Sequence, residues 1–300
     1  MKKIFCLVSL VCCIILSCGN KDVNERLDDK SKTKDDSFIR VAFLPTIDAL
    51  PFFIAEERGL FEKENINIKL IPFKAQMDVD TALIGGSIDM AFTDLIRSER
   101  LKREKGVKLE YLTSTELYWI LVSNKTARIN RLEQFGDKMV AMTRWSATDY
   151  LTNKTFDNVK TKDLVYSVQI NDVDLRTNMI LNNEMDGAWL PEPQAARAVQ
   201  AGNKEVLNSM KYNEKLGVLS LRTNMKKKFG GDDTFEKLNK IYSAACDSIN
   251  KNGMKAYAPE LMKYCHVSSE VVAMIPKHVY IHAERPNDNI IKLAKGFQRR

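Results

Sequence analysis

The residues best suited to binding a small molecule directly follow apolar segments that are typical of β-strands. One group combines hydroxyl and carboxyl side chains and consists of Thr46, Asp48, Thr93, Asp94 and Ser114. A second group, farther along the chain, adds a cation and aromatic faces and consists of Arg144, Trp145, Ser146, Trp189 and Glu192. A guanidinium pairs with carboxylate, sulfonate or phosphate groups, and tryptophan faces suit flat ligands. The two groups predict a ligand-binding site without a catalytic residue.

Arg144 is the sharpest candidate of the second group. It precedes Ser146 and Thr148, two residue types that cap helix N-termini, where free backbone N–H groups favour anions. Arg144 therefore either pairs with an anionic ligand group or is a solvated arginine at the rim of the site. Asp48 and Asp94 either cap helices or hold a ligand amine or another hydrogen-bond donor. The sequence thus predicts a ligand that is anionic, or zwitterionic if the carboxylates contact it as well.

The two tryptophans of the second group have an alternative role. Trp145 and Trp189 either form walls of the binding site or pack in the core. Pro191 ends the predicted strand just beyond Trp189, which makes Trp189 the better candidate for a wall.

Composition and the remaining motifs exclude several other functions. With 44% hydrophobic and 28% charged residues among 300, the chain is ordinary globular protein, and a net charge of +7 does not require nucleic acid. Neither a paired C-x-x-C nor a G-x-x-x-x-G-K-[S/T] motif occurs. His278 and His282 have the spacing of zinc ligands on a helix, but residues 279–281 favour a strand, which would separate them. We therefore expect no metal, no cofactor and no nucleic acid.

Alternating strands and helices must position the candidate residues. Strands are predicted at 38–44, 66–71, 88–92 and 107–113, with helices between them, and a second alternation has strands at 139–142, 165–170 and 185–190. This rhythm predicts two α/β units, each a mainly parallel sheet flanked by helices, with ligands beyond the carboxyl ends of the strands. Segments around 117–130 and 217–223 join the units, and each begins with a strand-like stretch. We expect lobe 1 to comprise residues 38–123 and 223–300, and lobe 2 to comprise residues 124–222.

The amino terminus has the pattern of an export signal. Lys2 and Lys3 precede the apolar residues 4–16, a stretch too short to span a bilayer, which needs about 20 residues. Residues 15–19 resemble a bacterial lipobox, in which the chain is cut before the cysteine and the cysteine is then acylated, for example with palmitate. We expect a signal peptide at 1–17, lipidation of Cys18, and a highly charged, disordered tether at 18–37.

Four segments resemble the type II solute-binding proteins of nitrate, sulfonate, taurine and thiamine-precursor ABC importers. The first, residues 51–66, is an apolar helix followed by Gly-Leu-Phe, a run of charges and an apolar strand. The others are residues 82–91, the strand at 139–142, and the Trp-Leu-Pro-Glu-Pro sequence at 189–193, which in that family lies at the ligand cleft. The resemblance implies a two-lobed fold that closes on a small molecule, and an ABC permease with a separate ATPase as its partner.

The resemblance and the export signal together predict a lipid-anchored binding protein in the periplasm or on the outer cell surface. An enzyme on the same fold is the alternative. Pyrimidine synthases of the thiamine pathway carry clustered cysteines, which the chain after residue 18 lacks, and enzymes of the menaquinone pathway would not need an export signal. A sensor ectodomain acting through a partner is a third interpretation.

Overall fold

The structure of the protein, a computed structural model, describes residues 37–298. The predicted signal peptide, Cys18 and the tether up to residue 36 lie outside this range. Within it, none of the helices has the length and apolar character that a membrane crossing requires. The folded unit begins at Phe38 and contains two separate sheets of five strands each.

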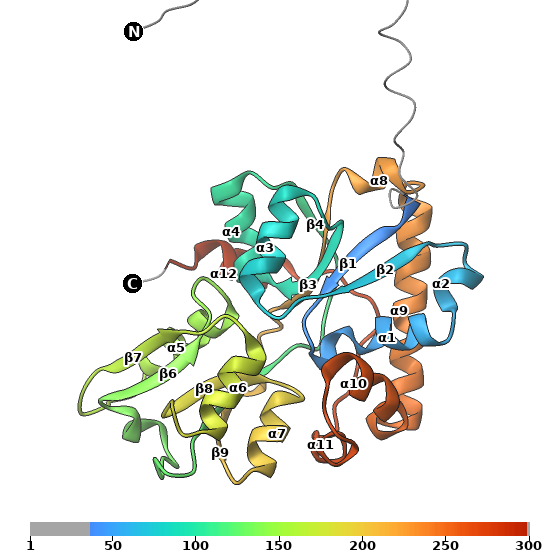
Figure 1. Ribbon diagram of the computed structural model, residues 1–300. Coiled ribbons are helices and arrows are strands. Elements are labelled where there is room, and N and C mark those ends of the chain that lie inside the picture. The colour runs from blue at the N-terminus through green and yellow to red at the C-terminus, as the bar shows by residue number, and fades with distance from the viewer. Residues whose placement is uncertain (1–36, 299–300) are drawn as a thin grey trace, which may run out of the picture. The chain divides into compact units, whose positions relative to one another are not determined.

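The first sheet organises lobe 1 and has the strand order β2-β1-β3-β10-β4 (Figure 1). Its strands are β1 (Ile39–Phe43), β2 (Ile68–Pro72), β3 (Met90–Asp94), β4 (Leu109–Ser114) and β10 (Gly217–Arg222). β1 pairs in parallel with β2 and β3, whereas β10 runs antiparallel to both β3 and β4. The carboxyl ends of β1 and β3 therefore lie at the same edge of the sheet.

The second sheet organises lobe 2 and has the order β7-β6-β8-β5-β9. Its strands are β5 (Trp119–Ser123), β6 (Lys138–Met142), β7 (Val165–Gln169), β8 (Gly187–Pro191) and β9 (Lys204–Asn208). β6 pairs in parallel with β7 and β8, and β5 runs antiparallel between β8 and β9. The two sheets repeat one plan, and they confirm the predicted two-lobed α/β fold.

Each sheet contains one strand from the other side of the expected lobe boundary. β5 lies in the sheet of lobe 2 although residues 38–123 were expected in lobe 1, and β10 lies in the sheet of lobe 1 although residues 124–222 were expected in lobe 2. Both strands are almost completely buried, so their apolar sequences fit either sheet and do not reveal which one they join. The chain crosses between lobes at residues 115–118 and 209–216, called the hinge segments below.

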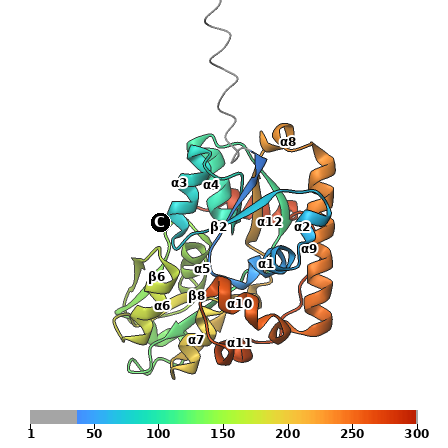
Figure 2. The same cartoon turned by 45° about the vertical axis from the view of Figure 1, so that its right-hand side comes forward.

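The helices cover the sheet faces. Lobe 1 contains α1 (Leu50–Glu57), α2 (Leu60–Lys63), α3 (Gln76–Gly85) and α4 (Leu95–Lys105), and lobe 2 contains α5 (Ala147–Phe156), α6 (Val173–Leu181) and α7 (Gln194–Gln200). The carboxyl-terminal part contains α8 (Met225–Lys228), α9 (Asp232–Asn252), α10 (Ala258–Cys265), α11 (Ser269–Met274) and α12 (Asp288–Gly296). In both views α9 runs along one side of lobe 1 (Figures 1 and 2), and α11 packs against α7 of lobe 2. The carboxyl-terminal part thus contacts both lobes.

α1 fixes the segment that precedes it. Pro51 lies in its first turn, and Gly59, in the left-handed conformation, separates it from α2, as the sequence predicts. The ring of Phe52 packs edge-on against Phe92 of β3 at 5.2 Å and faces Tyr242 of α9 at 6.3 Å, both between ring centroids. This anchor holds the 3-10 turn at Ile47–Ala49 beside the end of the sheet.

The strand predicted at residues 279–281 is wrong. The backbone N–H of Tyr280 donates to Asn250 Oδ1 at 2.9 Å, and Asn250 Nδ2 donates to the Tyr280 carbonyl oxygen at 2.7 Å. A side chain of α9 therefore takes the place of a neighbouring strand. Cys246 on α9 and Cys265 on α10 are buried, free thiols.

Candidate ligand-binding site

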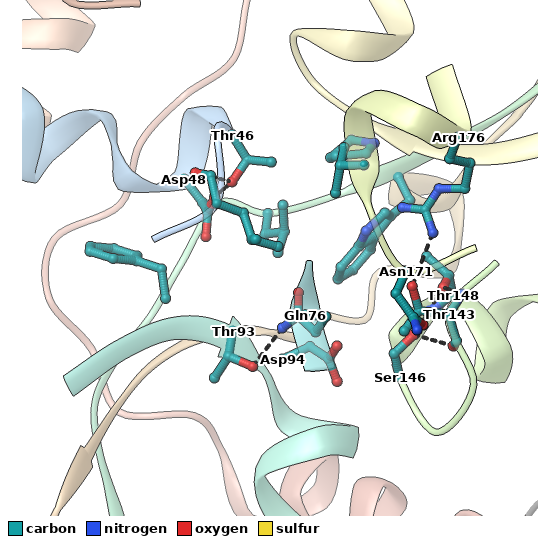
Figure 3. A pocket seen from close by; sticks show the side chains of 16 residues that line it. Thr46, Asp48, Gln76, Thr93, Asp94, Thr143, Ser146, Thr148, Asn171 and Arg176 are labelled. Atoms are coloured by element: carbon teal, nitrogen blue, oxygen red, sulfur yellow. Dashed lines mark hydrogen bonds between the residues drawn. The ribbon is translucent and has the colours of Figure 1, made fainter. Parts of the chain in front are cut away.

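A cavity, called the central cavity below, is lined by residues of both lobes (Figure 3). Most of its walls lie at or just beyond the carboxyl ends of β1, β3, β6, β7 and β8, the side on which parallel sheets bind ligands. Lobe 1 contributes Leu44, Thr46, Asp48, Gln76, Phe92, Thr93 and Asp94. Lobe 2 and the first hinge segment contribute Leu117, Trp119, Thr143, Ser146, Thr148, Asn171, Val173, Arg176 and Pro191.

Asp48 is a fully buried carboxylate in the wall of lobe 1. Thr46 Oγ1 donates to Asp48 Oδ1 at 2.5 Å, and Thr115 Oγ1 donates to Oδ2 at 3.4 Å. Burial raises the pKa of Asp48 to about 6, because the two hydroxyls and nearby backbone N–H groups offset only part of the desolvation of the charged form. Asp48 therefore offers an acceptor for a cation or hydrogen-bond donor inside the cavity.

Asp94 lies at the end of β3 and caps α4. Its Oδ1 accepts the Arg97 backbone N–H at 2.9 Å. Burial raises the pKa of Asp94 to about 6, against the lowering effects of the Arg97 guanidinium and of backbone N–H donors on Arg97 and Ala147. Ala147 is the first residue of α5 in lobe 2, so this carboxylate also interacts with the helix end at which the sequence predicts an anionic ligand group.

Arg176 is the cation of the central cavity, and it belongs to α6 of lobe 2. Its side chain is buried, and Nη1 donates to Thr143 Oγ1 and to the Ile170 carbonyl oxygen, both at 3.1 Å. Nε is buried and has no hydrogen-bond partner among the described residues. Desolvation lowers the pKa of Arg176 to about 10, although Asp172 opposes this effect. The guanidinium therefore has capacity left for an acceptor on a ligand.

Arg176 and the aromatic wall formed by Trp119 were not among the residues predicted from the sequence. Arg176 lies one turn into a helix, where its direction depends on how α6 meets the sheet, and only its position soon after a predicted strand could have indicated it. Trp119 begins β5 and pairs with Pro191, the last residue of β8. Its place at the cavity follows from the inclusion of β5 in the second sheet.

The two lobes touch around the central cavity. Arg97 Nη1 of lobe 1 donates to the Arg144 carbonyl oxygen of lobe 2 at 3.1 Å. The Met77 sulfur of α3 accepts hydrogen bonds from Asn171 Nδ2 at 2.9 Å and from Gln169 Nε2 at 3.3 Å.

Further contacts join the lobes through the backbone. The Val173 N–H donates to the Lys74 carbonyl oxygen at 3.2 Å, and the Ile47 N–H donates to the Glu192 carbonyl oxygen at 3.1 Å. Gln194 Nε2 donates to the Pro45 carbonyl oxygen at 2.8 Å. Because most of these bonds use backbone atoms or neutral side chains, they hold the lobes in a closed arrangement without a large network of ion pairs between them.

The structure brings half of the predicted site residues together. Those that line the central cavity are Thr46, Asp48, Thr93, Asp94 and Ser146. Those that do not line it are Ser114, Arg144, Trp145, Trp189 and Glu192. Ligand contact by any of them stays a prediction, and the position of each outlying residue has a local cause.

Arg144 and Trp145 line a separate outer groove, which is also lined by Met77, Asp80 and Arg100. Trp145 adopts a left-handed backbone conformation with φ of 57°, and its N–H donates to Asp149 Oδ2 at 2.8 Å. The Arg100 guanidinium carbon lies 5.2 Å from the centre of the Trp145 ring. The turn at Trp145 thus directs this loop toward α4 and the outer groove.

The other three outlying residues lie within the lobes. Trp189 is fully buried in the core of lobe 2, and the Ser114 N–H donates to the Glu284 carbonyl oxygen at 2.7 Å. The Glu192 carboxylate accepts the Ala196 N–H at 2.9 Å at the start of α7, and burial raises its pKa to about 7. Trp189 therefore packs in the core, Ser114 pairs with another segment at the end of β4, and Glu192 accepts a hydrogen bond at the start of α7.

The histidines are apart from the cavity and from each other. His278 Nε2 lies 2.9 Å from Glu116 Oε2, and His282 Nε2 lies 2.7 Å from Asp247 Oδ1. The described part of the chain contains no group of three or more histidine, cysteine, aspartate or glutamate side chains placed to hold a metal ion.

Comparison with known proteins supports the resemblance noted in the sequence. Residues 32–115 match the model of the NMT1-like family. No curated protein sequence matches the chain.

Solved structures of binding proteins share the fold. The periplasmic aliphatic sulphonate binding protein SsuA from Escherichia coli is 16% identical, with a TM-score of 0.69 over 86% of this chain and 89% of that one. The ligand binding component of an ABC-type import system from Staphylococcus aureus is also 16% identical, with a TM-score of 0.71 over 86% and 89%. The periplasmic nitrate-binding protein NrtA from Synechocystis is 15% identical, with a TM-score of 0.67 over 78% and 68%. At these identities the similarity shows the fold.

Proposed function

We propose that this chain is an extracytoplasmic solute-binding protein, which captures a small molecule in the central cavity and delivers it to the permease of an ABC importer. The observation that carries the proposal is a cavity between two lobes, each with its own sheet, in which both lobes contribute polar and apolar walls. A ligand at this position touches both lobes at once and so favours their closed arrangement.

The hinge segments make opening and closure possible. Each sheet keeps its own hydrogen-bonded ladder, and only residues 115–118 and 209–216 join the two sheets through the chain. The contacts between the lobes include single hydrogen bonds, which water can replace when the lobes separate, and apolar packing such as that of Val173 in the cluster that contains Leu44. Because the ligand binds the closed state more tightly than the open state, it shifts the equilibrium between them toward the closed state.

Delivery of the bound molecule requires a partner protein, and the structural neighbours support a transporter as that partner. The neighbouring structures include the ligand binding component of an ABC-type import system. We propose that the permease and its ATPase are other chains, and that the closed lobes present the loaded cavity to the permease. The sequence predicts a ligand that is anionic or zwitterionic.

The amino terminus would hold the binding protein at the membrane. We propose export through the signal at residues 1–17, acylation of Cys18 with palmitate or a similar chain, and a tether at 18–37 that leads to the folded unit. The charged composition of the tether supports a spacer role, because it offers little apolar surface to bury.

Binding with product analysis tests the proposal against an enzyme on the same fold. The purified protein is titrated with a metabolite extract, washed, and the retained compound is identified by mass spectrometry before and after long incubation. A solute-binding protein retains one compound per chain and releases it unchanged. Conversion of the retained compound into a product would contradict the proposal.

A further inference from the structure

The polar groups of the central cavity are divided by charge between the lobes. Lobe 1 contributes the carboxylates of Asp48 and Asp94, and lobe 2 contributes the guanidinium of Arg176 (Figure 3). Asp48 is paired with the hydroxyls of Thr46 and Thr115, and its partners within residues 37–298 include no cation. A buried carboxylate without a cation is costly to keep ionised. A cationic group on the ligand would remove that cost.

Arg176, on the opposite wall of the central cavity, is the corresponding buried cation. Its hydrogen-bond partners are the Thr143 hydroxyl and the Ile170 carbonyl oxygen, both neutral, and its buried Nε lacks an acceptor in the described part of the chain. An anionic acceptor on the ligand would satisfy Nε and balance the charge. A ligand that pairs with both Asp48 and Arg176 therefore needs a cationic group and an anionic group on one molecule.

The other site expected to attract an anion is already used by the protein. The N-terminus of α5 receives the Asp94 carboxylate through the Ala147 N–H, and the same carboxylate accepts the Arg97 N–H. The Arg97 guanidinium pairs with Asp80 and lies close enough to Asp94 to lower its pKa. An anion entering the cavity thus finds this helix end and Arg97 engaged, and has Arg176 as its remaining cationic partner in the cavity wall.

The charge balance decides between the two ligand classes that the sequence allows. Among the residues that line the cavity, Asp48 and Asp94 face Arg176, so these side chains together carry an excess of one negative charge when all are ionised. A simple anion would increase that excess in a site of low dielectric constant. A molecule with both charges leaves the excess unchanged and pairs both Asp48 and Arg176.

We propose that the ligand is a small zwitterion, with an ammonium or amidinium group bound by Asp48 and a carboxylate, sulfonate or similar acceptor bound by Arg176. This inference rests on the proposed function and narrows it. It separates this chain from a binding protein for simple inorganic or aliphatic anions, even though such proteins share its fold. Phe92, Trp119 and Val173 would contact the apolar part of the molecule between the two charged ends.

Matched pairs of compounds test the zwitterion directly. The full-length protein, extracted in detergent, is titrated calorimetrically with taurine and ethanesulfonate, β-alanine and propionate, and 4-(aminomethyl)benzoate and 4-methylbenzoate. In parallel, compounds captured from a metabolite extract are identified by mass spectrometry. We expect the captured compound to carry an amine or amidine, and the amine-bearing member of any pair that binds to bind at least about 30-fold more tightly than its partner.

Two variants show whether Asp48 is responsible. Asp48→Asn keeps the shape and removes the charge, and it should abolish the preference for the amine. Asp78→Asn removes an equal charge from an exposed position on α3 outside the cavity, and it should keep the preference. Capture of an anion without an amine, or an unchanged preference in Asp48→Asn, would overturn the zwitterion and leave the solute-binding function standing. If no compound is captured and none of the pairs binds, the proposed function fails and the inference fails with it.

Discussion

Replacing Arg176 with methionine separates a ligand-binding arginine from a structural one. The guanidinium is buried and donates to two neutral acceptors, and its Nε has no acceptor in the described part of the chain. Methionine fills a similar volume without a charge. If a ligand acceptor pairs with the guanidinium in the closed cavity, its removal should cost about 2–5 kcal/mol of binding free energy, or roughly 30-fold to several thousand-fold in Kd.

The same substitution should not weaken the fold. A buried cation without a carboxylate partner carries a desolvation cost, so an apolar replacement leaves the free energy of unfolding unchanged or raises it. Binding is measured by calorimetry with the captured compound, and stability by urea unfolding without it. A structural role for Arg176 would instead show as lost stability with little change in affinity.

Arg144→Ala is the matched control in the same assay. Arg144 lies in the outer groove, so the structure predicts a loss well below 1 kcal/mol, as for other exposed charges. If Arg144 instead pairs with the ligand, as the sequence suggests, its removal would cost about as much as that of Arg176. Wild-type affinity in Arg176→Met, measured at low salt, would refute the reasoning for the cavity.

Three further predictions concern pH, the hinge and the anchor. Burial raises the pKa of Asp48 from 3.8 to about 6, so without ligand the folded state binds a proton more strongly between these values. The contribution of Asp48 to the free energy of unfolding should therefore rise by about 2 kcal/mol as the pH falls from 6 to 4. Asp48→Asn should flatten this rise in urea unfolding at each pH, and an unchanged slope would count against it. A Cβ on Gly217 would lie 2.5 Å from Leu117 Cβ, so Gly217→Ala should lose about 1–3 kcal/mol of stability and weaken binding, whereas Gly85→Ala, with open space around it, should do neither. Cys18→Ala should release the protein from the membrane fraction or leave it unprocessed, and an unchanged membrane-bound mature form would contradict lipidation.

The sequence predicts the layout of the fold well because the strands and helices carry local signals. Pro51 and Gly59 mark the beginning and end of α1, and the apolar strands alternate with helices in both lobes. These local signals could not predict which sheet β5 and β10 join. Both strands are buried on each face, and only pairing with distant strands decides where they lie.

The site could be predicted where the backbone alone fixes the position. Asp94 ends a strand and caps a helix, so its place at the sheet edge follows from the element boundaries. Trp145 was expected in the cavity, but its left-handed conformation directs the loop to the outer groove. Trp189 packs in the core, and Trp119, for which no role was predicted, lines the cavity, because β5 and not β8 presents its tryptophan to it. Such directions depend on loop angles and packing, which the spacing of residues does not encode.

Native mass spectrometry of the full-length protein tests the central claim most directly. The protein is incubated with a metabolite extract, and the mass of the folded chain is measured before and after release of the bound compound. We predict one small molecule per chain, released with unchanged mass and no longer retained by Arg176→Met. A compound that is retained equally by Arg176→Met, or that leaves the protein chemically altered, would contradict capture of a solute in the central cavity.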